Sequence, residues 1–88
     1  MADNDPIGKF IEAEMMIRSP EELGALLREA RKSVGLTQPQ LALAAGVGVR
    51  FIVELEAGKP TVRLEHVLRV IDALGCGLQL TGLPFEQP

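Results

Sequence analysis

Gly46 and Gly48 stand one residue apart in the stretch AAGVGVRF, where they could bind a phosphate group or turn the chain. A dinucleotide-binding loop needs a third glycine three residues after the second, and a strand before the first. Position 51 is Phe51, and the residues before Gly46 have helical spacing. We therefore interpret the pair as a turn between two helices, in which Gly46 adopts a positive φ at little cost.

Residue types that serve catalysis or metal binding are sparse. Cys76 is the one cysteine, so it forms no intrachain disulfide, and with the one histidine, His66, it makes no zinc pattern. We expect Cys76 to be a small buried hydrophobe and His66 to lie on a helix surface. Because no acid–base pair or nucleophile set is present, we expect no enzymatic activity, no metal and no cofactor.

Charge is unevenly distributed along the 88 residues, although the net charge is −3. Residues 28–63 hold six basic residues against three acidic ones, a local charge of +3. Residues 1–27 carry −4 and residues 64–88 carry −2. A polyanion responds to a local basic face and not to the total charge, so the middle of the chain is the region to bind nucleic acid.

Four helices are predicted to position these residues. Their capping and stop signals delimit residues 19–35, 37–46, 48–58 and 61–75. Ser19 with Glu22, and Thr37 with Gln40, have the spacing of a capping box, whereas Gly48 and Thr61 are the expected caps of the last two helices. The apolar positions at helical spacing predict the core: Leu23, Leu27, Ala30, Val34, Leu41, Ala42, Ala45, Ile52, Leu55, Leu64, Val67, Leu68, Ile71 and Leu74.

The end of the chain predicts a different element. Leu78 and Leu80 alternate with polar residues, which indicates one short strand. A lone strand leaves its backbone groups unpaired, so it must pair with residues near 15–18 or with a second copy of the chain. No apolar run approaches the ~18 residues of a membrane span, and the acidic start is unlike a signal peptide. We expect one small cytoplasmic domain that does not contact a membrane.

The stretch GLTQPQLALAAGVGVRFIVELEAGKPT, residues 35–61, resembles the Xre-type helix-turn-helix domains shared with phage repressors. Residues 17–80 look more closely like the HipB-like antitoxins. The resemblance implies an all-α, lambda-repressor-like helix-turn-helix domain of four to five helices over residues 17–75. It also implies a dimerisation strand over 76–82 that pairs across a homodimer. Residues 1–16 are then an N-terminal extension, partly disordered or a short helix, and 83–88 a tail.

The resemblance places the third helix in the major groove of DNA. Val49, Arg50 and Glu54 are then the base contacts, with Arg50 able to donate to guanine O6 and N7, Val49 to pack on a thymine methyl and Glu54 to accept from cytosine N4. Alternatively, Arg50 and Glu54 are four residues apart and simply pair on the helix surface. Gly48 stands where the family usually has Ser or Thr, and Val49 where it is commonly polar.

The remaining implied roles divide into three groups. The phosphate contacts are Gln38, Gly48, Lys59 and Arg63. Arg31 and Glu56 resemble the family's internal ion pair between the first and third helices. The dimer interface is Cys76, Leu78 and Leu80.

The implied function is that of a repressor that binds a palindromic operator as a homodimer. Membership of the HipB-like group further implies an antitoxin that binds a HipA-like kinase toxin and regulates its own operon. Two alternatives stay open: a free-standing Xre-family repressor without a toxin, and a helical protein-binding module that has lost DNA binding.

Overall fold

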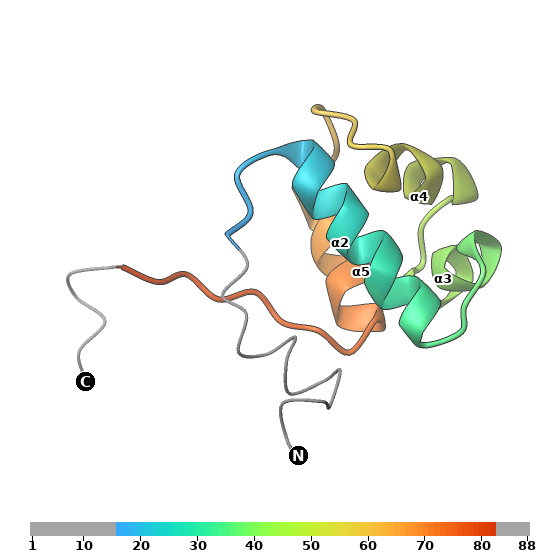
Figure 1. The fold of residues 1–88 in the computed structure, drawn as a ribbon. Coiled ribbons are helices and arrows are strands. Elements are labelled where there is room, and N and C mark those ends of the chain that lie inside the picture. Colours follow the sequence, from blue (N-terminus) through green and yellow to red (C-terminus); the bar gives the residue numbers. More distant parts are fainter. Residues whose placement is uncertain (1–15, 83–88) are drawn as a thin grey trace, which may run out of the picture.

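The computed structural model describes residues 16–82, and the predicted extension and tail lie mostly or wholly outside this range. Within these residues the chain is all-α (Figure 1). The helices are α2 (Pro20–Ser33), α3 (Gln38–Ala45), α4 (Val49–Glu56) and α5 (Leu64–Ala73). Helix α3 packs against both α4 and α5, and α4 packs against α2.

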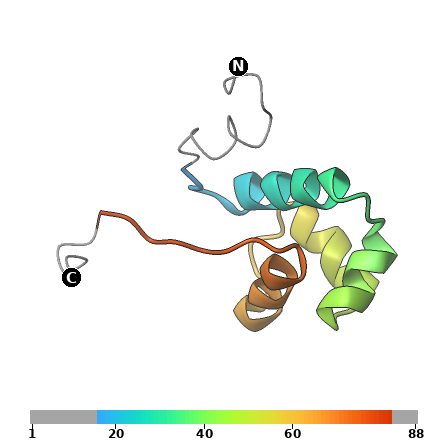
Figure 2. The same ribbon diagram turned by 90° about the horizontal axis from the view of Figure 1, so that it is seen from below.

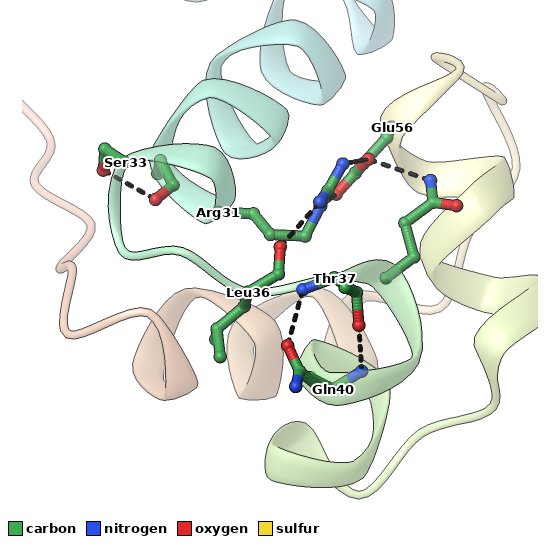
Figure 3. Close-up of polar contacts among 8 residues, drawn as sticks. Arg31, Ser33, Leu36, Thr37, Gln40 and Glu56 are labelled. Atoms are coloured by element: carbon green, nitrogen blue, oxygen red, sulfur yellow. Dashed lines mark hydrogen bonds and ion pairs between the residues drawn. The ribbon is translucent and has the colours of Figure 1, made fainter.

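Capping side chains fix where α2 and α3 begin. Thr37 Oγ1 accepts from the Gln40 N–H at 3.2 Å, and Gln40 Oε1 accepts from the Thr37 N–H at 2.9 Å, so the predicted capping box is complete (Figure 3). Ser19 Oγ accepts from the Glu22 N–H at 3.1 Å. The Glu22 carboxylate, however, accepts from the N–H of Arg18 at 2.6 Å and not from that of Ser19. Only one of the two hydrogen bonds of the predicted capping box is therefore formed at α2.

Helix α5 begins later than the sequence predicts. Its N-cap is Arg63, without a side-chain hydrogen bond, so the prediction of Thr61 as the cap is wrong. Val62 is half-buried and packs against the core from within the connection. This packing holds the chain in a non-helical path until Leu64.

The core joins all four helices. Its buried members are Leu27, Leu41, Ala42, Ala45, Ile52, Leu55, Val67, Val70, Ile71 and Leu74. Val70 is fully buried although it was outside the predicted set, whereas Val34, Leu64 and Leu68 are 53%, 67% and 45% exposed against that prediction. The buried face of α5 therefore follows Val67, Val70, Ile71 and Leu74, and Leu68 lies beside it.

A glycine allows α2 and α4 to approach closely. A Cβ atom on Gly24 would collide with the backbone carbonyl oxygens of Leu55 and Glu56 at the end of α4. The absence of a side chain at this position is therefore what sets the spacing of the two helices.

Residues 76–82 leave the helical domain on the side away from α3 and α4 (Figures 1 and 2). They have no regular secondary structure, and residues 16–82 contain no strand. The alternative in which the predicted strand pairs with residues near 15–18 is not seen for residues 16–18. Cys76 is exposed in the single chain, so the prediction that it is buried is wrong.

Candidate nucleic-acid interface

The turn between α3 and α4 places the start of α4 at the surface. Gly46 has a left-handed backbone with φ of +73°, and Gly48 is the N-cap of α4 with an ordinary extended backbone. Val47 between them is half-buried against the core. Helices α3 and α4 with this turn form a helix-turn-helix, which agrees with the interpretation of the two glycines as a turn.

Helix α4 has one buried face and one exposed face. Ile52 and Leu55 are 0% and 3% exposed and hold the helix to the core. On the outer face the Arg50 side chain is 90% exposed, and Val49 and Val53 are 43% and 45% exposed. Val53 was not predicted as a site residue, although it lies four residues after Val49 and so on the same face of the helix.

Glu54 links two basic residues on this surface. Its carboxylate accepts from Arg50 Nε at 3.1 Å and from Lys59 Nζ at 3.2 Å. The hydrogen bond from Arg50 and, to a smaller extent, the hydrogen bond from Lys59 lower the pKa of Glu54 below its ordinary value. The alternative of a surface pair between Arg50 and Glu54 is therefore the arrangement in the free chain.

A second, more enclosed ion pair joins α2 to the end of α4 (Figure 3). Arg31 Nε donates to Glu56 Oε2 at 2.7 Å and Arg31 Nη2 donates to Glu56 Oε1 at 3.1 Å, and the side chains are only 11% and 4% exposed. Arg31 Nη1 also donates to the carbonyl of Leu36 at 2.8 Å. Hydrogen bonding with Glu56 raises the pKa of Arg31, so the guanidinium stays charged.

Gln38 is attached to this ion pair. Its Nε2 donates to Glu56 Oε1 at 3.0 Å, which orients the amide at the start of α3. Because an amide nitrogen has two N–H groups, one donor remains for another acceptor. The Arg31–Glu56 pair therefore also positions a predicted phosphate contact.

A shallow surface hollow of about 310 Å³ lies beside Gln38 and is also lined by Arg28, Val53, Glu56 and Ala57. Arg28 is exposed and pairs with no acidic side chain among residues 16–82. Arg28 was not among the site residues predicted from the sequence. The only signal for it was its place in the basic stretch, and tertiary structure was needed to bring it to Gln38.

The other predicted site residues are all accessible. Gly48 is exposed, with open space where a Cβ would lie, and the Lys59 side chain is 44% exposed. The Arg63 side chain is 72% exposed and lies 3.8 Å from a carboxylate oxygen of Glu65. Leu78 and Leu80, predicted at a dimer interface, are 59% and 75% exposed.

Three other features of the described residues bear on the kind of site: possible metal ligands, membrane-spanning helices and the one histidine. Residues 16–82 hold no group of three His, Cys, Asp or Glu side chains that could bind a metal ion. None of the helices in this range is both long and apolar enough to cross a membrane. His66, predicted on a helix surface, is half-buried on α5, and its ring packs edge-on against Phe51 at a centroid distance of 5.2 Å.

The helix-turn-helix geometry and the exposed face of α4 define the class of protein. The chain belongs to the helix-turn-helix domain family, whose pattern matches residues 22–82. It is 52% identical over 64 residues to an uncharacterized HTH-type transcriptional regulator, y4mF, of Sinorhizobium fredii, covering 73% of this chain and 84% of that protein. It is 46% identical over 52 residues to another such regulator of Methanothermobacter thermautotrophicus, covering 57% and 72%.

Solved structures show the same fold. The HipB–O4 20mer complex and the HipA–HipB–O2–O3 complex each match with a TM-score of 0.71 at 24% identity, over 76% of this chain and 94% of the matched chain. The complex of a HipB variant with an O2 20mer matches with a TM-score of 0.73 at 23% identity, over 78% and 96%. The all-α helix-turn-helix fold expected from the sequence is thus confirmed, and the chain is related to transcriptional regulators.

Proposed function

We propose that this protein is a sequence-specific DNA-binding repressor that inserts α4 into the major groove of its operator. The observation that carries the proposal is the division of α4 into two faces. Ile52 and Leu55 anchor the helix, while Arg50, with its side chain 90% exposed, projects from the first turn. The relationship to HTH-type transcriptional regulators supports the same function.

Three kinds of base contact fit the outer face of α4. Arg50 donates to O6 and N7 of a guanine, and Val49 and Val53 provide apolar contact for thymine methyl groups. Glu54 accepts from the N4 amino group of a cytosine once its bonds to Arg50 and Lys59 are exchanged. Such a surface reads a short segment that mixes G·C and A·T base pairs.

Phosphate contacts flank this surface. Gln38 has one free N–H donor at the start of α3, and Arg28 lines the same hollow. Lys59, Arg63 and the backbone of Gly48 complete the proposed set. These contacts position α4 and supply the salt-dependent part of the affinity.

The proposed active form is a homodimer on a palindromic operator. Residues 76–82 would pair antiparallel with the same residues of a second copy, which would satisfy their backbone groups and cover Leu78 and Leu80. Two α4 helices would then lie about 34 Å apart, one turn of DNA. A dimer bound at a promoter excludes RNA polymerase.

An antitoxin role is the finer part of the proposal. The structural likeness to a protein solved in the HipA–HipB–O2–O3 complex supports a HipA-like kinase toxin as the partner, bound by a protein that regulates its own operon. A free-standing repressor is the alternative within the same class. A kinase-like reading frame beside the gene, and co-purification of its product with this chain, would support the antitoxin role; an isolated gene would favour the alternative.

The DNA-binding proposal is tested by titrating the protein with its own promoter DNA at several salt concentrations. We expect the logarithm of the association constant to fall linearly with the logarithm of salt concentration, as phosphate contacts release counterions. Absence of salt-dependent binding would overturn the proposal and favour the helical protein-binding module.

A further inference from the structure

We propose that Glu54 acts as a specificity-determining residue, by holding Arg50 and Lys59 away from DNA that lacks the correct base pair. The inference rests on the proposed function, because it concerns how the same surface discriminates among DNA sequences. Besides its proposed contact to a cytosine in the operator, Glu54 then also lowers the affinity for DNA that lacks the correct base pair.

The first step is the geometry of the three side chains. Glu54 Oε2 accepts from Arg50 Nε at 3.1 Å, and Glu54 Oε1 accepts from Lys59 Nζ at 3.2 Å. The two carboxylate oxygens are therefore each occupied by a different cation. Arg50 is the proposed base contact and Lys59 is a proposed phosphate contact, so one acidic side chain pairs with both in the free protein.

The second step is that these bonds are easily exchanged. The Arg50 and Lys59 side chains are 90% and 44% exposed, and ion pairs between exposed groups are weak. A guanine that offers two acceptors to Arg50 can therefore displace Glu54. The displaced carboxylate then needs a donor, and a neighbouring cytosine N4 amino group is the base edge that provides one.

The third step concerns DNA without that base pair. There Glu54 faces acceptor atoms and phosphates, so releasing both Arg50 and Lys59 would leave a carboxylate without a donor in the groove. The carboxylate keeps its two cations instead, and the protein loses the contacts that Arg50 and Lys59 would make to the DNA. Discrimination then comes from a penalty on wrong sequences as well as from a bond to the right one.

The experiment compares Glu54→Gln with wild type on two probes. One probe is a duplex enriched from a random-sequence pool by the wild-type protein, and the other is the unselected pool. For Glu54→Gln we expect about three- to tenfold tighter binding to the unselected pool, since two weak ion pairs no longer compete. The salt slope on that pool should steepen by about one to two units, as Arg50 and Lys59 reach phosphates. Affinity for the enriched duplex should stay level or fall.

Glu65→Gln is the matched control. Glu65 also lies within ion-pair distance of two arginines, with Arg69 at 3.1 Å and Arg63 at 3.8 Å, but it is on α5. The same change of net charge there should leave the ratio of the two affinities unchanged. A helical circular dichroism spectrum and an unchanged melting temperature will show that Glu54→Gln is folded.

Equal gains on both probes, or the same loss of discrimination in Glu65→Gln, would overturn the role of Glu54 while leaving the proposed function standing. If the wild-type protein enriches no duplex and shows no salt-dependent binding, the proposed function fails, and this inference fails with it.

Discussion

Glu56 binds the guanidinium of Arg31 through both of its carboxylate oxygens, at 2.7 and 3.1 Å. This pair connects α2 to the last turn of α4, and through Gln38 it also reaches the start of α3. The side chains are 11% and 4% exposed, so water does little to replace either partner. This enclosed ion pair thus joins the end of α4 to α2 and α3, in addition to the core packing of Ile52 and Leu55.

Replacing Glu56 with Gln should therefore destabilise the fold. The substitution keeps the size of the side chain but leaves the Arg31 charge enclosed without its counterion, which costs about 3 kcal/mol. Urea unfolding followed by circular dichroism measures the loss. The same substitution at exposed Glu65, which pairs with Arg69 at 3.1 Å, should cost only about 0.3–0.5 kcal/mol. Similar losses at the two positions would contradict the structural role of the Arg31–Glu56 pair.

The parts of the fold that the sequence predicted depend on local chemistry. The Thr37–Gln40 capping box and the left-handed backbone at Gly46 involve residues within one turn of each other, so their types and spacing are sufficient. The resemblance to a known family added the pairing of Arg31 with Glu56, which are 25 residues apart.

The parts that the sequence did not predict depend on tertiary packing. Thr61 has the chemistry of a helix cap, but the half-buried Val62 keeps the following residues out of a helix until Leu64. Arg28 meets Gln38 at one hollow only because α2 and α3 fold together. Cys76 is exposed in the single chain, because residues 76–82 extend away from the helices (Figure 1). Its burial therefore depends on a contact that the amino-acid pattern alone does not reveal.

Two glycines with different surroundings should respond in opposite ways to an added side chain. Gly24→Ala places a Cβ against the carbonyl oxygens of Leu55 and Glu56, and should destabilise the protein by about 1–3 kcal/mol despite the better helix propensity of alanine. Gly48→Ser meets open space and adds an N-cap hydroxyl, so it should stabilise by a few tenths of a kcal/mol. Thermal and urea unfolding measure both. A stabilised Gly24→Ala variant would show that α2 and α4 are not in close contact.

Arg50 and Lys59 should have different effects on DNA binding. Arg50→Ala should weaken binding to an enriched duplex by about 1–3 kcal/mol, with a smaller loss on random DNA, because Arg50 is proposed to contact guanine. Lys59→Ala should reduce the salt slope on the enriched duplex by about one unit, because Lys59 is proposed to contact a phosphate, and should change binding to random DNA little, because Glu54 holds Lys59 there. Fluorescence anisotropy titrations at several salt concentrations distinguish the two. An equal loss on both DNAs for Arg50→Ala would rule out base reading by that residue.

The titration of Glu54 should report its two ion pairs. Arg50 and Lys59 lower the pKa of the Glu54 carboxyl, so its midpoint in a carbon-13 NMR titration should fall below the usual glutamate value of about 4.3. A carboxyl with a lowered pKa in the folded state adds stability above its unfolded pKa, and this contribution is lost as the pH falls through the folded pKa. Arg50→Ala should raise the pKa of Glu54 more than Lys59→Ala does, since Arg50 is the larger cause. A midpoint that neither variant moves would show that the pairs do not persist in solution.

Leu78→Asp should separate the proposed homodimer into monomers. Leu78 and Leu80 are 59% and 75% exposed in the single chain, and residues 77–82 make no backbone–backbone hydrogen bond with the described residues. In a paired strand Leu78 would lose contact with water, so a carboxylate there would be buried at a large cost. Sedimentation velocity should show a dimer for wild type and a monomer for the variant. Leu43→Asp is the control, because Leu43 is 84% exposed on α3, a helix that lies away from residues 76–82 (Figure 1), and it should leave the dimer intact. A Leu78→Asp protein that sediments as a dimer would place the interface elsewhere, and a monomeric wild-type protein would remove the dimer from the proposal.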